Sequence, residues 1–209
     1  MLAVAVLAFF GSRLVVAAGR SLQPPARRHT ATLLRGLRWR HFLPVPAVMA
    51  LVLTAAFVLL AVPGLSFGWW MAIGGEGNPV FGVTETTAGT PLELLLPLAF
   101  IALLLPALPL LVEGEERMFR LGAEAWPWPR RVWKGLLFGV VHALIGIPIG
   151  VAIALSIGGW YFMASYLRAW RATHSRTAAL QESTRAHLAY NLTIIAIVTV
   201  LLLALLATA

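Results

Sequence analysis

The stretch LELLLPLAFIALLLPALPLLV, residues 92–112, decides which kind of fold this chain can adopt. It is almost entirely apolar, and it has the length of roughly twenty residues that a helix needs to cross the hydrocarbon core of a bilayer. The next residues, EGEERMFR at 113–120, hold three of the eight acidic residues in the chain. This pattern predicts a transmembrane helix whose last turns carry an unusual amount of charge.

The overall composition also indicates a membrane protein. The chain has 209 residues, of which 60% are hydrophobic and 11% are charged, whereas soluble domains carry about 25% charged residues. The formal net charge of +8 does not indicate nucleic-acid binding, because the basic residues cluster in short stretches between apolar runs, as they do in cytoplasmic loops. No cysteine is present, which excludes disulfides, thiol catalysis and thiolate metal sites. Abundant arginine without aspartate is typical of a GC-rich coding bias and favours a bacterial plasma membrane.

Apolar runs and basic stretches alternate in a way that predicts an all-α, polytopic transmembrane bundle of about six spans with both termini outside. Basic residues place the stretches 20–41, 113–134 and 168–185 on the cytoplasmic side. The stretch 66–91 has no Lys or Arg and is rich in Gly and Thr, as expected of an exported loop. The predicted spans are 2–19, 43–65, 92–112, two short spans within 135–168, and 187–208.

Two short spans are predicted within 135–168 because no charge interrupts this stretch before Arg168. A single helix at 1.5 Å per residue needs far fewer residues to cross. The two flanking stretches are predicted on the same side, so an even number of crossings must separate them. We expect the turn near GIPIG, residues 146–150. The chain then divides into 1–91, with the N-terminal spans and the exported loop, and 92–209, with the candidate functional residues.

Glu115, Glu116 and Arg120 do not fit a lipid-facing span, and an ionisable group within an apolar span usually marks a cavity or a reaction centre. Glu116 and Arg120 are four residues apart, so they can form an ion pair along one helix face. Neighbouring helical residues point about 100° apart. We therefore expect that the two carboxylates do not share a partner and that Glu115 is free to point into the bundle.

His142, in FGVVH at 138–142, and the pair His187 and Asn191 are further polar residues within apolar runs. His187 and Asn191 lie one helical turn apart, so they share a face at the start of the last span. Each histidine taken alone fits a hydrogen-bonded core residue equally well. A carboxylate, two histidines and an asparagine on three separate spans can together activate water and stabilise an oxyanion.

These residues form an ordered set of motifs that resembles the CPBP family, which comprises the CAAX proteases and bacteriocin-processing enzymes. EERMFR at 115–120 is similar to the family's EExxxR motif, FGVVH at 138–142 to its FxxxH motif, and HLAYN at 187–191 to its HxxxN motif. The resemblance covers residues 113–191, and no comparable match is found in the N-terminal spans. One departure is Leu121, which follows the arginine where the family commonly has Gly.

The resemblance implies an intramembrane peptidase with a CPBP-like catalytic core at 92–209. Glu115 would be the general base and His142 would assist it in activating water. His187 and Asn191 would stabilise the oxyanion of the tetrahedral intermediate. The supporting residues would be Glu116, Arg120 and Phe138.

A zinc-dependent version of this peptidase is an alternative, because Glu115, His142 and His187 are residue types that ligate zinc. The HExxH spacing is absent, however, asparagine is an unusual zinc ligand, and a neighbouring arginine would oppose a dication. We therefore expect a metal-independent glutamic-type endopeptidase without a resident cofactor.

The predicted function is hydrolysis of a membrane-associated peptide or membrane protein within or beside the bilayer. One alternative is a non-catalytic membrane scaffold or bacteriocin-immunity factor that uses the same polar cluster for binding. Another is a small transporter with a proton relay, against which no inverted repeat is apparent between the two halves. Membrane lipids are expected partners and nucleic acid is not. The other ionisable residues expected at the membrane surface include His29, His41, His174, Glu113 and Glu124.

Overall fold

The computed structural model describes residues 2–73 and 89–208, and these residues form an all-helical structure without a β-strand. The prediction of an all-α fold is therefore confirmed for the part of the chain described. The α-helices are α1 (Leu2–Ser21), α2 (Pro24–Arg35), α3 (Trp39–Phe42), α4 (Val45–Leu60), α5 (Leu92–Arg120), α6 (Trp128–Val140), α7 (Ile149–Ala154), α8 (Ser156–Thr173) and α9 (Arg176–Thr208). Three short 3-10 helices are η1 (Trp69–Ile73), η2 (Ala123–Ala125) and η3 (Val141–Ile145).

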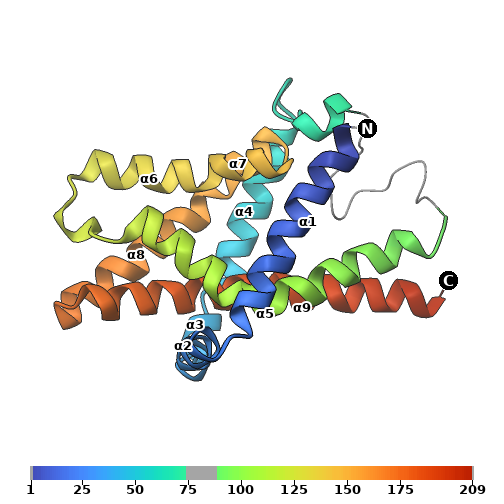
Figure 1. Cartoon of the computed structure of the whole chain (residues 1–209). Coiled ribbons are helices and arrows are strands. Elements are labelled where there is room, and N and C mark those ends of the chain that lie inside the picture. The colour runs from blue at the N-terminus through green and yellow to red at the C-terminus, as the bar shows by residue number, and fades with distance from the viewer. Residues whose placement is uncertain (1, 74–88, 209) are drawn as a thin grey trace.

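Helix α5 is longer than the apolar run that predicted it, because the charged stretch 113–120 continues the helix to its end. Pro97, Pro106 and Pro109 lie inside α5, and each removes a backbone hydrogen bond and favours a kink. Figure 1 shows α5 bent near its middle. The charged residues are therefore carried by helical turns, which fix the directions of their side chains.

Helix α9 begins earlier than the predicted span, at Arg176 and not at His187. It packs against α5 along an apolar seam in which the buried Leu108 and Val112 meet Leu188. Both helices extend beyond their apolar runs, so the charged end of α5 lies beside the polar N-terminal part of α9 (Figure 1). This contact between two helical extensions positions the candidate site.

The stretch 135–168, which is uncharged up to Arg168, folds back on itself, as expected. The chain turns at Gly146, whose φ of 89° is readily adopted only by glycine, and α7 and α8 then return along α6 (Figure 1). At Gly139 a Cβ atom would lie 2.4 Å from the carbonyl oxygen of Ala152, and at Gly159 it would lie 2.5 Å from a carbonyl oxygen of α6. Glycine at these two positions lets α6 approach α7 and α8 backbone to backbone.

The basic stretch 20–41, expected as a loop, forms α2 and α3 instead. Helix α2 begins with prolines in its first turn, where the missing N–H group has no helical partner in any case. It buries Leu33 in the apolar seam between α5 and α9. Helix α2 is amphipathic, because helical periodicity lets it bury the side with Leu33 while its arginines remain outside.

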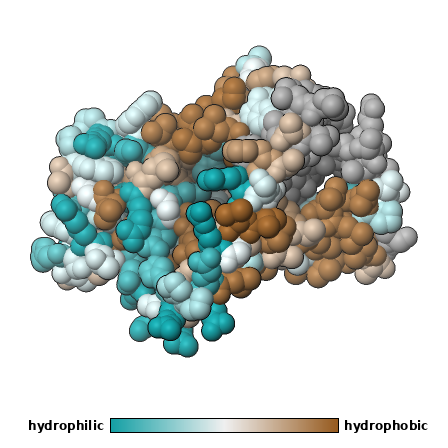
Figure 2. Space-filling view, viewed as in Figure 1, coloured by the Kyte–Doolittle hydropathy of each residue, from teal (hydrophilic) through white to brown (hydrophobic). Residues whose placement is uncertain are grey.

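Four helical stretches among the described residues are long and apolar enough to cross a membrane: Trp39–Leu60, Leu92–Ala125, Ile149–Thr173 and Arg176–Ala207. This finding agrees with a membrane protein, whereas the predicted count of six spans is not confirmed. Figure 2 shows hydrophobic residues gathered on the right, over the outer halves of α5 and α9, and hydrophilic residues on the left and below. Most of the predicted exported loop, residues 74–88, lies outside the described residues.

Candidate functional site

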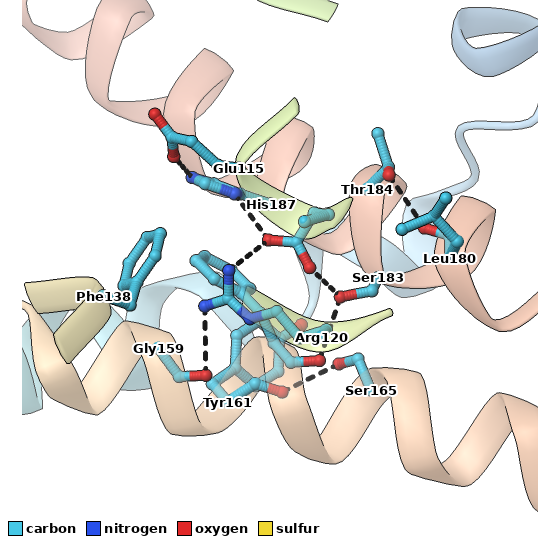
Figure 3. A network of polar contacts seen from close by, with 12 residues as sticks. Glu115, Arg120, Phe138, Gly159, Tyr161, Ser165, Leu180, Ser183, Thr184 and His187 are labelled. Atoms are coloured by element: carbon cyan, nitrogen blue, oxygen red, sulfur yellow. Dashed lines mark hydrogen bonds and ion pairs between the residues drawn. The ribbon is translucent and has the colours of Figure 1, made fainter. Parts of the chain in front are cut away.

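A buried ion pair between Glu116 and Arg120 forms the centre of the site. Both side chains are fully buried, and Nη1 of Arg120 donates to Oε1 of Glu116 over 2.9 Å. Nη2 of Arg120 donates to the carbonyl oxygen of Gly159 on α8 over 3.2 Å. The guanidinium lies 4.2 Å from the centre of the Phe138 ring on α6, a cation–π contact. The predicted i,i+4 pair is therefore present, and it also joins α5 to α6 and α8 (Figure 3).

The Glu116 carboxylate is fully engaged by its neighbours. Its Oε1 also accepts a hydrogen bond from Nδ1 of His187 over 2.9 Å, and its Oε2 accepts one from the hydroxyl of Ser183. Ser183 and His187 lie one turn apart on α9, so a single carboxylate fastens α5 to two turns of α9. Because both oxygens are buried and hydrogen-bonded, Glu116 holds the structure together and is not available to a water molecule.

The imidazole of His187 is buried and fixed by two aromatic rings. It stacks on Phe162 with 4.2 Å between ring centres and 18° between the planes, and the Phe138 ring meets it at 5.4 Å with its edge. Nδ1 faces Glu116, and Nε2 lies 3.8 Å from Oε2 of Glu115. An ionised carboxylate only accepts hydrogen bonds, so Nδ1 carries a proton and Nε2 is the nitrogen left for chemistry.

Glu115 differs from Glu116 in being accessible. Its side chain is 39% exposed, and the 3.8 Å that separate it from His187 are too long for a direct hydrogen bond. The expectation that the two carboxylates cannot share a partner is wrong. They leave the helix in different directions, but the two nitrogens of one imidazole also point in different directions, and each faces one carboxylate (Figure 3).

His142 lies in η3, directly after α6, and is partly buried. Its Nδ1 is 2.7 Å from the carbonyl oxygen of Phe138. A carbonyl oxygen only accepts, so Nδ1 is the donor and Nε2 is unprotonated in the neutral ring. The His142 ring lies 5.0 Å from the Phe138 ring, which also contacts His187. The two histidines therefore border the same phenyl ring.

Asn191 lies one turn after His187 on α9 and faces a different space. It lines a cavity of about 200 Å³ between α5 and α9, opposite apolar α5 residues such as Leu104 and Leu108. Its carboxamide forms no hydrogen bond with the residues that the structure describes. The structure thus brings Glu115 and His187 together, connects His142 to them through a shared phenyl ring, and sets Asn191 apart in a neighbouring cavity.

Ser183, Phe162 and Gly159 belong to the site, although no motif pointed to them. Ser183 could have been found, because it lies one turn before His187 and therefore shares its face of the helix. Gly159 follows another glycine within an apolar helix, a pattern that indicates close approach of two backbones. Phe162 gives no such signal, since one more aromatic residue in an apolar run is ordinary.

Two acidic residues expected at the surface are held inside the structure instead. Glu113 is buried and contacts His29 of α2 as well as an arginine of its own helix. The carboxylate of Glu124 accepts hydrogen bonds from Tyr166 and from Arg176, at the junction of α8 and α9. Both carboxylates fasten α5 and the segment after it to neighbouring helices, and so support the frame around the site.

His41 was also expected at the surface, but it is buried. Its Nε2 lies 3.1 Å from Oε1 of Glu182 on α9, which also pairs with Arg40 and lies 3.8 Å from Arg185. This cluster holds α3 against α9. His174 is exposed, as expected.

Within the described ranges, no group of three His, Cys, Asp or Glu residues is disposed to hold a metal ion. Of the three ligands considered for zinc, Glu115 and Nε2 of His187 lie together. His142 contacts the ring of Phe138 on α6, which also contacts His187.

Comparison with protein-family models, with curated proteins and with solved structures finds no match for this chain. The resemblance to the CPBP family therefore rests on the three motifs between residues 115 and 191. A function for the chain has to be proposed from the geometry of the site together with those motifs.

Proposed function

We propose that this chain is a membrane-embedded endopeptidase in which Glu115 activates a water molecule for attack on a peptide bond. The observation that carries the proposal is the contrast between two neighbouring carboxylates. Glu116 is buried and hydrogen-bonded at both oxygens, whereas Glu115 is 39% exposed and faces a histidine nitrogen. A catalytic base must reach both water and substrate, and of the two carboxylates only Glu115 meets this requirement.

The reaction begins with a water molecule hydrogen-bonded to both the Glu115 carboxylate and Nε2 of His187, which lie 3.8 Å apart, beyond direct hydrogen-bond distance. Glu115 takes one proton as the water oxygen bonds to the peptide carbonyl carbon, and negative charge moves to the carbonyl oxygen. When the carbon–nitrogen bond breaks, Glu115 returns the proton to the amine leaving group. The products are a carboxylic acid and an amine.

The remaining motif residues position and stabilise this reaction. Nε2 of His142, unprotonated in the neutral ring, accepts a hydrogen bond from the attacking water. His187 is held by Glu116 and, when both ring nitrogens carry protons, donates from Nε2 to the oxyanion. The carboxamide of Asn191, which in this structure lines a separate cavity, becomes the second donor when its side chain turns toward the same carbonyl oxygen. One donor of this kind is worth about 3 to 4 kcal/mol in a dry site.

We further infer that the chain belongs to the CPBP family and crosses a bacterial plasma membrane six times. The four long apolar helices support the membrane assignment. The two further crossings would come from α1 and from the stretch of α6 and η3. The substrate would be a membrane-associated peptide or a membrane protein, and no resident cofactor would take part.

Peptide cleavage by the purified protein in detergent tests the proposal. The substrate is a mixed library of peptides from digested membrane proteins, and new termini are detected by mass spectrometry. The wild-type chain should produce new termini and Glu115→Gln should not. Glu93→Gln is the matched control, because Glu93 lies in the first turn of the same helix, far along the chain from the site, and it should cleave like the wild type.

Two outcomes would contradict the proposal. Undiminished cleavage by Glu115→Gln would show that Glu115 is not the general base. No new termini from folded wild-type protein is the result expected of a non-catalytic scaffold. A parallel sample with a metal chelator separates the two versions of the peptidase, because only the zinc-dependent version would lose its cleavage.

A further inference from the structure

A groove of about 580 Å³ lies between α6 and α8, outside the candidate site. Its floor is a stripe of α8 in which Trp160, Met163 and Leu167 are spaced by three and four residues and therefore share one face. Trp128 and Val132 of α6 form a wall. Trp160 is 41% exposed and Trp128 is 71% exposed, so the groove is open along its length and its lining is almost wholly apolar.

Two arginines, Arg131 and Arg171, lie at the end of the groove where α6 begins and α8 ends. Arg171 lies in the last turn of α8 and is exposed, and it pairs with no carboxylate of the described residues. Nε and Nη2 of Arg131 donate to the carbonyl oxygens of Ala123 and Glu124 over 3.0 and 3.1 Å. These bonds hold the guanidinium in place, and no carboxylate of the described residues neutralises it. The groove is thus apolar along its floor and positive at one end.

We propose that this groove binds one acyl chain of an anionic phospholipid, with the lipid phosphate against Arg131 and Arg171. The stripe from Trp160 to Arg171 is roughly 16 Å long at the rise of an α-helix, close to the half-thickness of about 15 Å of a bilayer hydrocarbon core. Both arginines belong to basic stretches that the positive-inside rule puts on the cytoplasmic side. Basic pockets between membrane helices on that side suit anionic headgroups.

An acyl chain fits the groove better than a peptide does. The indole nitrogen of Trp160, a polar atom of the floor, already donates to the carbonyl oxygen of Val132 over 3.0 Å. A peptide backbone in such a groove would lose its hydrogen bonds to water without replacement, whereas an acyl chain has none to lose. A zwitterionic headgroup gains less than an anionic one from two unpaired cations, because its own ammonium group opposes them.

The test is a fluorescence titration of the purified full chain in detergent with brominated phosphatidylglycerol or brominated phosphatidylcholine. Bromine quenches nearby indoles, and two tryptophans line the groove. Phosphatidylglycerol should quench at a lower mole fraction than phosphatidylcholine, and Arg171→Gln should weaken its binding about five-fold, because one basic residue at a membrane surface is worth about 1 kcal/mol. Arg131→Gln combined with Arg171→Gln should abolish the preference.

Controls on the same helices keep the test specific. Arg168→Gln on α8 removes an arginine that lines a different cavity, and Arg130→Gln on α6 removes one whose guanidinium lies over Trp126; both should keep the lipid preference. Arg171 makes no hydrogen bond with the described residues, so its single variant stays informative even if loss of Arg131 impairs folding. Equal quenching by both lipids, an unchanged preference in Arg171→Gln, or an equal loss in Arg168→Gln would overturn the proposal.

Discussion

Glu116 and Glu115 are adjacent on α5, yet the regions around them have opposite character. Glu116 lies fully buried among Arg120, Ser183 and His187, and both of its oxygens are hydrogen-bonded. Glu115 lies at an open edge, where its carboxylate faces one ring nitrogen beyond hydrogen-bond distance. The difference teaches that one turn of helix can supply both a structural fastening and, in the proposed mechanism, a reactive group, because only one of the two carboxylates is fully buried in the contact with α9.

The largest effect on stability is expected from Arg120→Met, which removes the ion-pair partner of the buried Glu116. It leaves the Glu116 carboxylate buried without its ion-pair partner, and breaking such a pair costs about 3 to 5 kcal/mol. Chemical unfolding in mixed detergent micelles should show a loss of this size. The double variant Arg120→Met with Glu116→Gln removes the stranded charge, so it should recover part of the loss. A double variant no more stable than the single one would mean that the buried charge is not what matters.

Asn191→Leu tests the opposite case to Glu116, a polar side chain whose loss should affect catalysis and not stability. The carboxamide lines an apolar cavity and has no hydrogen-bond partner among the described residues, so leucine of similar size should leave the free energy of unfolding unchanged or raise it. If Asn191 donates to the oxyanion, kcat should fall about 10²-fold to 10³-fold. Cleavage kinetics and unfolding measured on the same preparation check both statements, and unchanged kcat would remove Asn191 from the mechanism.

Ser183→Ala should produce an intermediate loss of stability. The hydroxyl of Ser183 donates to Glu116, and a hydrogen bond to a charged group contributes about 1.5 to 3 kcal/mol. Thr184→Val is the matched control, because Thr184 is equally buried but its hydroxyl bonds only to the carbonyl oxygen of Leu180 in its own helix. Unfolding of the two variants under the same conditions should rank Ser183→Ala as the more damaging, and the reverse order would be evidence against the Glu116 network.

The smallest effect is expected from His29→Ala, at the outer edge of the molecule. His29 is partly exposed, and its partner Glu113 keeps a second contact with Arg117. Because water reaches the His29 side of the pair and Glu113 keeps Arg117, we expect a loss close to that of an exposed pair, about 1 kcal/mol, so the unfolding midpoint should move little. A loss as large as that of Ser183→Ala would show that α2 is a structural part of the site and not a peripheral helix.

Local patterns in the sequence predicted the helical fold and the pairing of Glu116 with Arg120. Both depend on spacing along one chain segment, either the length of an apolar run or a separation of four residues. The turn at Gly146 was predicted for a similar reason, because an uncharged stretch was too long for one helix. Such features need no knowledge of which helices meet in space.

Contacts between distant segments could not be predicted in the same way. Three of these contacts depend on how α5, α8 and α9 cross. Two carboxylates face His187, Phe162 stacks on its ring, and Glu113 is buried against α2. The same limit applies to the start of α9, because an apolar run marks where a helix is hydrophobic and not where it begins. Asn191 shows the limit most clearly, since it shares a helix face with His187 and nevertheless lines a cavity that His187 does not line.

The most direct test of the division between the two glutamates is cleavage per folded molecule, measured side by side for Glu115→Gln and Glu116→Gln. Glu115→Gln should stay as stable as the wild type and lose about 10²-fold to 10⁴-fold in kcat, the range that general acid–base catalysis supplies. Glu116→Gln should lose stability, because it breaks the buried pair with Arg120. Retained cleavage in Glu115→Gln, or equal destabilisation by the two substitutions, would contradict the division of roles.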